Sequence, residues 1–478
     1  MGAARQRYRQ ACSEEWQDMS KKSGSSVGGG TCVILDNGAG RIKYGASVFG
    51  QDAELKGSIP NTMAKANKQM QVLIGDQMEE VHDKASLKYT RPFERGYMTN
   101  PHCQIEIWKR VFETPPMLGG VARPESTSLL ITEPPFAPEP IQNDLNEIVF
   151  EEFGFHEYMR RPAAWFSAYE FDKSRAPPPR PAAAAAAAIS PRRGGAAAAT
   201  PVSSALLTQN CCTIIDTGFS FSHVFPFIDG KCKKTAVKRV NVGGKLLTNY
   251  LKGLVSLRQY DMADEFYLVD QVKEQTCYVS TRFVDELAQC TKAAGAGGAR
   301  SGKEVFDYRG ERMRKLFVLP DFQRIMRGFV KEDDAMEELG EQILTMETER
   351  FAVPEVLFHP SDIGMNQAGI CEAMSQCIAE LSDVELGLCV SDVVLTGGNA
   401  RLPQFRERFH AEIRSIVPDI FKLETHLPEE PQNYAWNGAA RFVKDENATG
   451  TLSKHFVTRA EYLEYGHDYV NEKFFRNW

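Results

Sequence analysis

Two short apolar runs, far apart in the chain, each end in an aspartate followed by a glycine-containing turn. The first run, Cys32 to Leu35, leads into Asp36-Asn37-Gly38-Ala39-Gly40, and Arg41 to Val48 then places apolar residues at alternate positions. A buried run, a turn and an alternating run are typical of a β-hairpin. The pattern therefore predicts two strands joined by this turn.

The second run shows the same pattern of strand, aspartate and glycine turn in the other half of the chain. Thr213 to Ile215 leads into Asp216-Thr217-Gly218, and Phe219 to Phe227 alternates almost strictly between apolar and other residues. A third turn of related kind, Thr396 to Asn399, follows the apolar run Val393 to Leu395. Two hairpins that open two halves predict duplicated domains that face each other.

Helical patterns stand between these strands, for example at Gln142 to Phe153 and at Gln367 to Leu381. A chain that mixes such helices with buried strands indicates the α/β class.

Two segments lack the pattern of a folded core. Residues 1–30 end in the flexible sequence SGSSVGGG, and alanine, proline and arginine dominate between Lys173 and Ser204. Prolines bracket the alanine block and no apolar stripe could dock it, so an isolated helix there would be marginal. We predict a disordered N-terminal extension at residues 1–30 and a disordered low-complexity insertion at residues 171–205.

Composition then limits the function. Of the 478 residues, 42% are hydrophobic, which suffices for two or three domains, and the net charge of −7 argues against a surface that coats nucleic acid. None of the eleven cysteines forms a Cys-x-x-Cys pair, which indicates buried thiols in a reducing compartment. No apolar run approaches the roughly 18 residues that a membrane span needs. We therefore expect no membrane contact.

The three turns also suggest a chemistry. Glycine turns expose backbone N–H groups that attract phosphate oxygens, and an adjacent carboxylate can hold the hydrated Mg²⁺ that phosphate brings. Asp36 and Asp216 are accordingly candidate magnesium ligands acting through water. Each turn alone is weak evidence, since most such turns are ordinary hairpins. Three of them in this order across paired halves are far more specific.

Longer segments resemble actin and its relatives. ETERFAVPEVLFHPSDIGMNQAGICEAM, from Glu347 to Met374, is similar to actin's strand–loop–helix segment, and NVGGKLLTNYL, KEQTCYV and VVLTGGNARLP match actin as closely. The resemblance covers nearly everything from Thr31 onward except the insertion and part of residues 285–345. It implies an α/β, actin-like two-lobed fold with duplicated mixed-sheet domains around a nucleotide cleft.

The resemblance also implies domain boundaries. The first lobe would comprise residues 31–170 and 430–478, and the second residues 206–429, with a smaller subdomain at about 245–350.

KYTRPFERGYMTN (Lys88 to Asn100) and VTRAEYLEYG (Val457 to Gly466) are similar to a nuclear class of actin-related proteins. That likeness implies a subunit of Swr-type chromatin remodellers, which exchange a variant histone. The implied partners are a remodeller ATPase and a zinc-finger subunit, with nucleosomes and histones reached indirectly and DNA contact left open. The implied location is the nucleus, with the cytoplasm as the alternative. The segment between Pro60 and Gly75 is shorter than actin's subunit-contacting loop, so filaments are not expected.

The family pattern implies a site for ATP or ADP with Mg²⁺. Lys43 matches a phosphate-contacting lysine, Lys273 and Glu274 match residues near the base and ribose, and His223 falls where the family positions water. The implied cofactor-binding residues are Asp36, Asn37, Gly38, Ala39, Gly40, Lys43, Asp216, Thr217, Gly218, Lys273, Glu274, Gly397, Gly398 and Asn399.

Departures from this pattern argue against hydrolysis. Phe219 stands where the family has a further aspartate, and Pro162 or Ala163 stands where it has a water-orienting glutamine. Ala39 replaces the usual serine. We therefore predict a non-catalytic interaction subunit, a pseudo-ATPase in which His223 is vestigial. A genuine actin-like ATPase and a cytoskeletal actin-related protein remain the alternatives.

Overall fold

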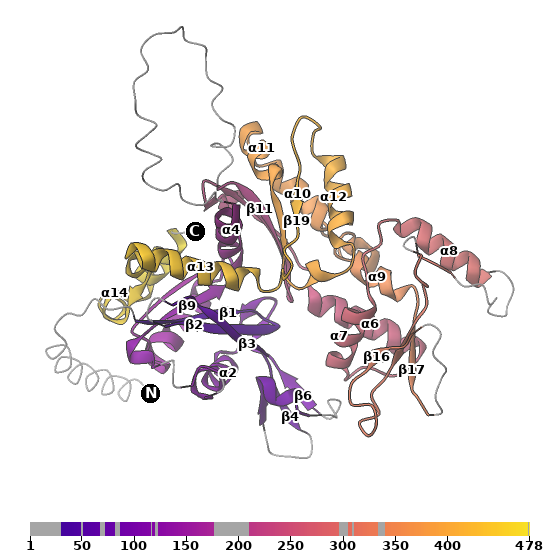
Figure 1. The fold of residues 1–478 in the computed structure, drawn as a ribbon, viewed down its shortest axis with the longest axis horizontal. Helices are drawn as coiled ribbons and strands as arrows, with labels where there is room; N and C mark the ends of the chain where they lie inside the picture. Colours follow the sequence, from indigo (N-terminus) through magenta and orange to yellow (C-terminus); the bar gives the residue numbers. More distant parts are fainter. Residues whose placement is uncertain are drawn as a thin grey trace, which may run out of the picture.

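The computed structural model describes residues 30–48, 51–66, 72–81, 87–115, 117–119, 123–175, 210–295, 305–307, 310–332, 340–476 and 478. The described chain forms two lobes, each built on a mixed sheet that carries helices (Figure 1). The predicted α/β class is confirmed. The two predicted disordered segments lie outside the described residues, apart from Gly30 and residues 171–175.

The first lobe holds a six-stranded sheet in the order β20-β10-β9-β1-β2-β3. β1 (Thr31–Asn37) runs antiparallel to β2 (Arg41–Ser47) and parallel to β9 (Thr127–Glu133). The other elements of this lobe are β3 (Glu54–Pro60), β10 (Glu157–Pro162), β20 (Val457–Thr458), α2 (Pro101–Glu113), α3 (Glu139–Glu147), α4 (Ala163–Arg175), α13 (Tyr434–Thr449) and α14 (Arg459–Arg476).

The second lobe repeats this arrangement in the order β13-β12-β11-β18-β19, with β14 paired to β12. β11 (Cys212–Thr217) runs antiparallel to β12 (Ser222–Ile228) and parallel to β18 (Val393–Thr396). The central hairpin and its parallel neighbour therefore occur twice. The other elements are β13 (Lys231–Cys232), β14 (Lys238–Val240), β19 (Thr425–His426), α10 (Ile370–Ile378), α11 (Asp383–Ser391) and α12 (Phe405–Ile416).

Smaller sheets extend each lobe. In the first lobe these are β5-β4-β6 and the hairpin β7-β8, and in the second β16-β15-β17 lies beside α6 and α7 (Figure 1). Within the described ranges, no helix combines the length and apolar character that a membrane crossing requires. The bounds are β4 (Met63–Ala66), β5 (Val72–Ile74), β6 (Leu87–Thr90), β7 (Phe93–Glu94), β8 (Tyr97–Met98), β15 (Lys315–Val318), β16 (Phe329–Val330), β17 (Ile343–Met346), α6 (Gly244–Arg258), α7 (Phe266–Thr276), α8 (Phe283–Gly295) and α9 (Glu349–Glu355).

Two elements begin or end at other residues than the sequence pattern predicts. β12 begins at Ser222, because the Gly218 N–H donates to the Phe221 carbonyl at 3.0 Å and so keeps residues 218–221 in the turn. α4 continues to Arg175, inside the segment predicted to be disordered, because Phe171 is buried and Arg175 forms an ion pair with Asp392 of the second lobe.

Helices α4 and α13 join the two lobes. They pack along each other, α13 also contacts β1, and α4 contacts β11 (Figure 1). A Cβ atom on Gly438 of α13 would lie 2.0 Å from the carbonyl oxygen of Phe166 in α4. The close approach of α4 and α13 therefore requires a glycine at position 438.

We expect Gly438→Ala to lower the free energy of unfolding by about 1–3 kcal/mol, because the two backbones must separate to admit a methyl group. Gly253→Ala is the matched control. Gly253 is exposed within α6 and its Cβ position has no neighbour within 4 Å, so this change should stabilise the protein by about 0.5–1 kcal/mol. Urea unfolding followed by circular dichroism measures both. A Gly438→Ala midpoint at or above that of the wild type would contradict the packing argument.

Candidate functional site

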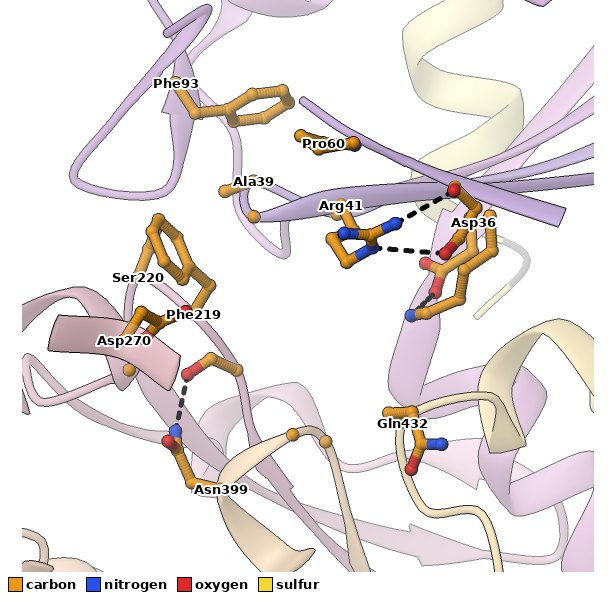
Figure 2. A pocket seen from close by; sticks show the side chains of 18 of the residues that line it. Asp36, Ala39, Arg41, Pro60, Phe93, Phe219, Ser220, Asp270, Asn399 and Gln432 are labelled. Atoms are coloured by element: carbon orange, nitrogen blue, oxygen red, sulfur yellow. Dashed lines mark hydrogen bonds and ion pairs between the residues drawn. The ribbon is translucent and has the colours of Figure 1, made fainter. Parts of the chain in front are cut away.

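A cavity of about 930 Å³ lies between the lobes and is lined by residues of both. Figure 2 shows Asp36 and Gln432 on one side of it and Phe219, Asp270 and Asn399 on the other. The structure brings both hairpin turns and the third glycine turn to this one cavity. The predicted site residues that line it are Asp36, Asn37, Gly38, Ala39, Gly40, Lys43, Asp216, Gly218, Lys273, Glu274, Gly397, Gly398 and Asn399.

Asp36 lies near the end of β1, the first strand of the first hairpin, and both oxygens of its carboxylate have partners. Its Oδ1 accepts a hydrogen bond from the Thr132 hydroxyl at 2.7 Å, and its Oδ2 lies 2.5 Å from the Lys43 ammonium. Thr132 also accepts from the Asn37 N–H at 2.9 Å. Lys43 is the cross-strand partner of Asp36, so its charge neutralises this carboxylate at the cavity wall.

Asp216 lies at the equivalent position near the end of β11, the first strand of the second hairpin, but its carboxylate lacks such partners. No hydrogen bond or ion pair reaches its carboxylate from the described residues. Burial, and secondly the charge of Asp36, raise the pKa of Asp216 to about 6, which Lys43 only partly offsets. The two aspartates of opposite lobes are thus close enough to repel each other, and one of them is free to bind a ligand.

The third turn shapes the far wall of the cavity. Gly397 has a φ of +90°, and a Cβ there would lie 2.3 Å from the Thr217 carbonyl oxygen, whereas Gly398 has no neighbour within 4 Å of its Cβ position. The Asn399 amide donates to the Gly218 carbonyl at 2.7 Å. Asn399 therefore fixes the second hairpin to the third turn, and Gly398 leaves open space beside them.

Lys273 and Glu274 of α7 differ in their freedom to bind. The buried Lys273 ammonium donates to Asp270 at 2.6 Å and to the Thr248 hydroxyl at 2.8 Å. Glu274 is exposed at the cavity, and its pKa is raised by desolvation and by the charge of Asp270. Glu274 is accordingly the freer of the two groups.

Two predicted residues lie behind the cavity wall. Thr217 is buried and its hydroxyl donates to the Thr396 carbonyl at 2.8 Å. His223 is buried between the rings of Phe221 and Phe225, at centroid distances of 4.5 and 5.3 Å. Burial and the nearby Arg239 lower the pKa of His223 to about 3, so the imidazole is neutral. Phe221 and Phe225 line the cavity in its place.

The positions predicted to lack the water-orienting amide do face the cavity. Pro162 ends β10, Ala163 begins α4, and both belong to the lining, together with Ala164 and Ser167. Pro162, Ala163 and Ala164 offer only apolar side-chain atoms, and Ser167 adds a hydroxyl group. Glu133, which lies beside Pro162 on β9, also lines the cavity, and its carboxylate forms an ion pair with Arg160 at 3.0 Å.

Several lining or contacting residues escaped the sequence analysis. These are Thr132, Arg91 and Gln432, and none of them lies in one of the three glycine turns. For Thr132 a signal did exist, because it follows the buried run Leu129 to Ile131 as the aspartates follow theirs.

The residues present fit an adenine nucleotide at the end of the cavity formed by Gly398 and Gln432. The Gln432 Oε1 atom is buried without a hydrogen-bond partner among the described residues, so an amino group of a ligand could donate to it. At the other end, the uncommitted Asp216 beside Asp36 fits a hydrated Mg²⁺ carried by phosphate. The backbone of both turns lies between these two ends.

We expect Asp216→Asn to stabilise the nucleotide-free, metal-free protein at neutral pH. The folded-state pKa of about 6 exceeds the ordinary 3.8, so the contribution of this carboxyl to folding is largest below pH 4 and falls as the pH rises towards 6. The variant removes that loss, worth about 1–3 kcal/mol at neutral pH and nothing near pH 4. Denaturant unfolding at both pH values measures the difference.

Asp36→Asn is the matched comparison. It leaves the Lys43 ammonium, whose side chain is 16% exposed, without its carboxylate, and should destabilise the protein by about 3 kcal/mol. Equal effects of the two substitutions would contradict the asymmetry between the aspartates.

Comparison with known proteins agrees with this geometry. The family model described as Actin matches residues 29–475. The chain is similar to actin-related protein 6 of Neurospora crassa, with 34% identity over 93% of this chain and 94% of the relative. It is similar to actin-related protein 6 of Drosophila melanogaster (32% identity; 92% and 99% covered) and of Arabidopsis thaliana (31%; 93% and 99%). The predicted family is thereby confirmed: the chain belongs to the actin family.

Proposed function

We propose that the protein is a non-catalytic actin-related subunit of a nuclear chromatin-remodelling complex that exchanges a variant histone, and that its cleft holds ATP or ADP with Mg²⁺ as a structural ligand. The observation that carries the non-catalytic part is the cavity wall at Pro162 and Ala163. Neither of these two residues has a side-chain group that can hydrogen-bond an attacking water.

Phosphoryl transfer depends on positioning and on charge neutralisation. Proton transfer by a positioned side chain typically contributes about 10²–10⁴-fold to such reactions. Here the histidine in the predicted water-positioning place is buried between two rings and stays neutral. In this position His223 cannot hold a water molecule against a nucleotide phosphate chain in the cleft.

The proposed partners and location rest on the relatives. These are named actin-related protein 6 and are covered almost end to end, so the likeness extends over the whole fold. The class implies a remodeller ATPase and a zinc-finger subunit as partners, nucleosomes as the indirect target and the nucleus as the location. We propose these for this chain, and we do not expect filaments.

A genuine ATPase of the same fold is the second candidate, and the pair formed by Asp36 and Asp216 favours it, because it fits a metal-bound phosphate. That reaction would need His223 to turn out of its aromatic pocket. The buried imidazole therefore favours the non-catalytic proposal.

The purified full chain should show ATP turnover no faster than a blank without protein. Its denaturation should release unhydrolysed ATP or a stoichiometric amount of ADP that does not increase on incubation with ATP. Chromatography of the released nucleotide and a phosphate-release assay measure both. His223→Ala is the control and should change neither result. Turnover that His223→Ala abolishes would establish the ATPase instead.

Affinity purification of the tagged full chain from nuclear extract should recover a remodeller ATPase and a zinc-finger subunit in fixed ratio. Recovery should survive digestion of DNA by nuclease, because protein contacts make the complex. Recovery of actin filaments in place of these subunits would support the cytoskeletal alternative and overturn the proposal.

A further inference from the structure

Arg91 of the first lobe lies among aromatic rings of the second. Its guanidinium carbon is 4.4 Å from the ring centroid of Phe266, 5.2 Å from that of Phe219 and 5.6 Å from that of Tyr267. The Arg91 Nε atom is buried and has no hydrogen-bond partner among the described residues. The guanidinium therefore lies within the distance at which a cation is attracted to an aromatic face.

Phe219 carries the contact across to the first hairpin. A Cβ atom on Gly40 would lie 2.9 Å from the Phe219 ring, so the ring rests directly on the glycine of the opposite turn. The same ring contacts Phe266 at a centroid distance of 6.2 Å and lies 3.6 Å from the Cβ position of Gly244. One side chain thus spans the gap between the two turns. We call Arg91, Phe219, Phe266 and Gly40 the latch.

Two neighbouring contacts cross between the lobes on the same side of the cavity. The Phe221 ring occupies the space beside Gly96, where a Cβ atom would lie 1.4 Å from it. The Tyr267 hydroxyl donates to the Thr62 hydroxyl at 3.0 Å. The latch is therefore part of a continuous line of contact rather than a single touching pair.

We propose that the latch holds the two lobes closed over the cleft without help from a nucleotide or a divalent cation. Such a latch would regulate the proposed nucleotide cleft, and this inference rests on the proposed function because it takes the bound nucleotide not to be hydrolysed. In a cleft that a ligand closes, the ligand supplies the contacts to both lobes. Here arginine and aromatic side chains reach from one lobe to the other and supply such contacts directly.

The position of Phe219 makes this a property of this chain's own sequence. An aspartate in that place would offer no aromatic face to Arg91 and no ring to pack on Gly40. The phenyl ring does both. We therefore expect the latch to slow the exit of an adenine nucleotide from the cavity between the lobes.

Hydrogen exchange on the full chain tests the latch in the absence of nucleotide. The protein is stripped of nucleotide and cation, and the protection of the amides in residues 36–43 and 212–220 is measured with and without ADP. Wild-type protection should be the same in both states within twofold. Phe219→Ala should speed exchange about tenfold in the stripped protein, because a desolvated cation–aromatic contact of this kind changes an opening equilibrium by about that factor. ADP should restore its protection.

Two further variants keep the outcome interpretable. Arg91→Met retains the bulk of the side chain but removes its charge, and should reproduce the faster exchange. Phe283→Ala removes a comparably exposed ring that packs on Phe351 within the second lobe, and should leave these segments unchanged. Release of mant-labelled ADP, chased with unlabelled ADP, should quicken about tenfold in the two latch variants only.

Stripped wild-type protein that exchanges as fast as Phe219→Ala would overturn the proposal, as would equal exchange in Phe219→Ala and Phe283→Ala. A positive turnover assay with full protection in the stripped protein would instead refute the proposed function and leave the latch standing. The two failures are therefore distinguishable.

Discussion

The fold brings the carboxylates of Asp36 and Asp216, from opposite lobes, to one cavity, where the two charges repel each other. The residues around each carboxylate must compensate for this repulsion, and the two duplicated hairpins differ in how far they do so. In the strand register, Lys43 lies opposite Asp36 and His223 lies opposite Asp216. The His223 side chain, however, lies in an aromatic pocket and stays neutral. The threonine near the end of each parallel strand, Thr132 in β9 and Thr396 in β18, shows the same difference. Thr132 donates to Asp36, but Thr396 donates to the Ile215 carbonyl. Only the first aspartate is neutralised, so a cation or a proton must balance the second.

The local parts of this site could be predicted from the sequence. Asp36, Gly38, Asp216 and Gly397 belong to turns whose geometry is set within a few residues, and the strands beside them follow from their apolar runs. The family then implied that the turns converge. What could not be predicted depends on packing between distant segments. Arg91 belongs to a segment that the sequence analysis used only for its family resemblance, and only the tertiary structure places this side chain on rings that lie far along the chain. His223 keeps its predicted position on the strand, but its rotamer is decided by the two neighbouring phenylalanines.

Phe219 shows why a single substitution can have two effects. Read as a departure from the family pattern, it only removes a carboxylate. In the structure the ring also reaches Gly40 and completes the environment of Arg91, and both contacts link the lobes. Apolar contact between the turns does not depend on charge or on phosphate, unlike the contact that a nucleotide makes. The change that weakens the case for catalysis is therefore the same change that strengthens the closed arrangement.

A closed arrangement that does not depend on a ligand suits the proposed role of a subunit that presents a binding surface. In a nucleotide-driven cleft, the free energy of hydrolysis is useful only if it changes the angle between the lobes, because a ligand acts on a conformational equilibrium through its different affinity for the two states. Direct contacts at Arg91, at Phe221 with Gly96 and at Tyr267 with Thr62 favour one state before any ligand binds. Under the proposed function, a nucleotide bound in the cavity would stabilise that same state without changing the angle between the lobes. Partners bound to both lobes would therefore meet the same surface whatever nucleotide the cleft contains.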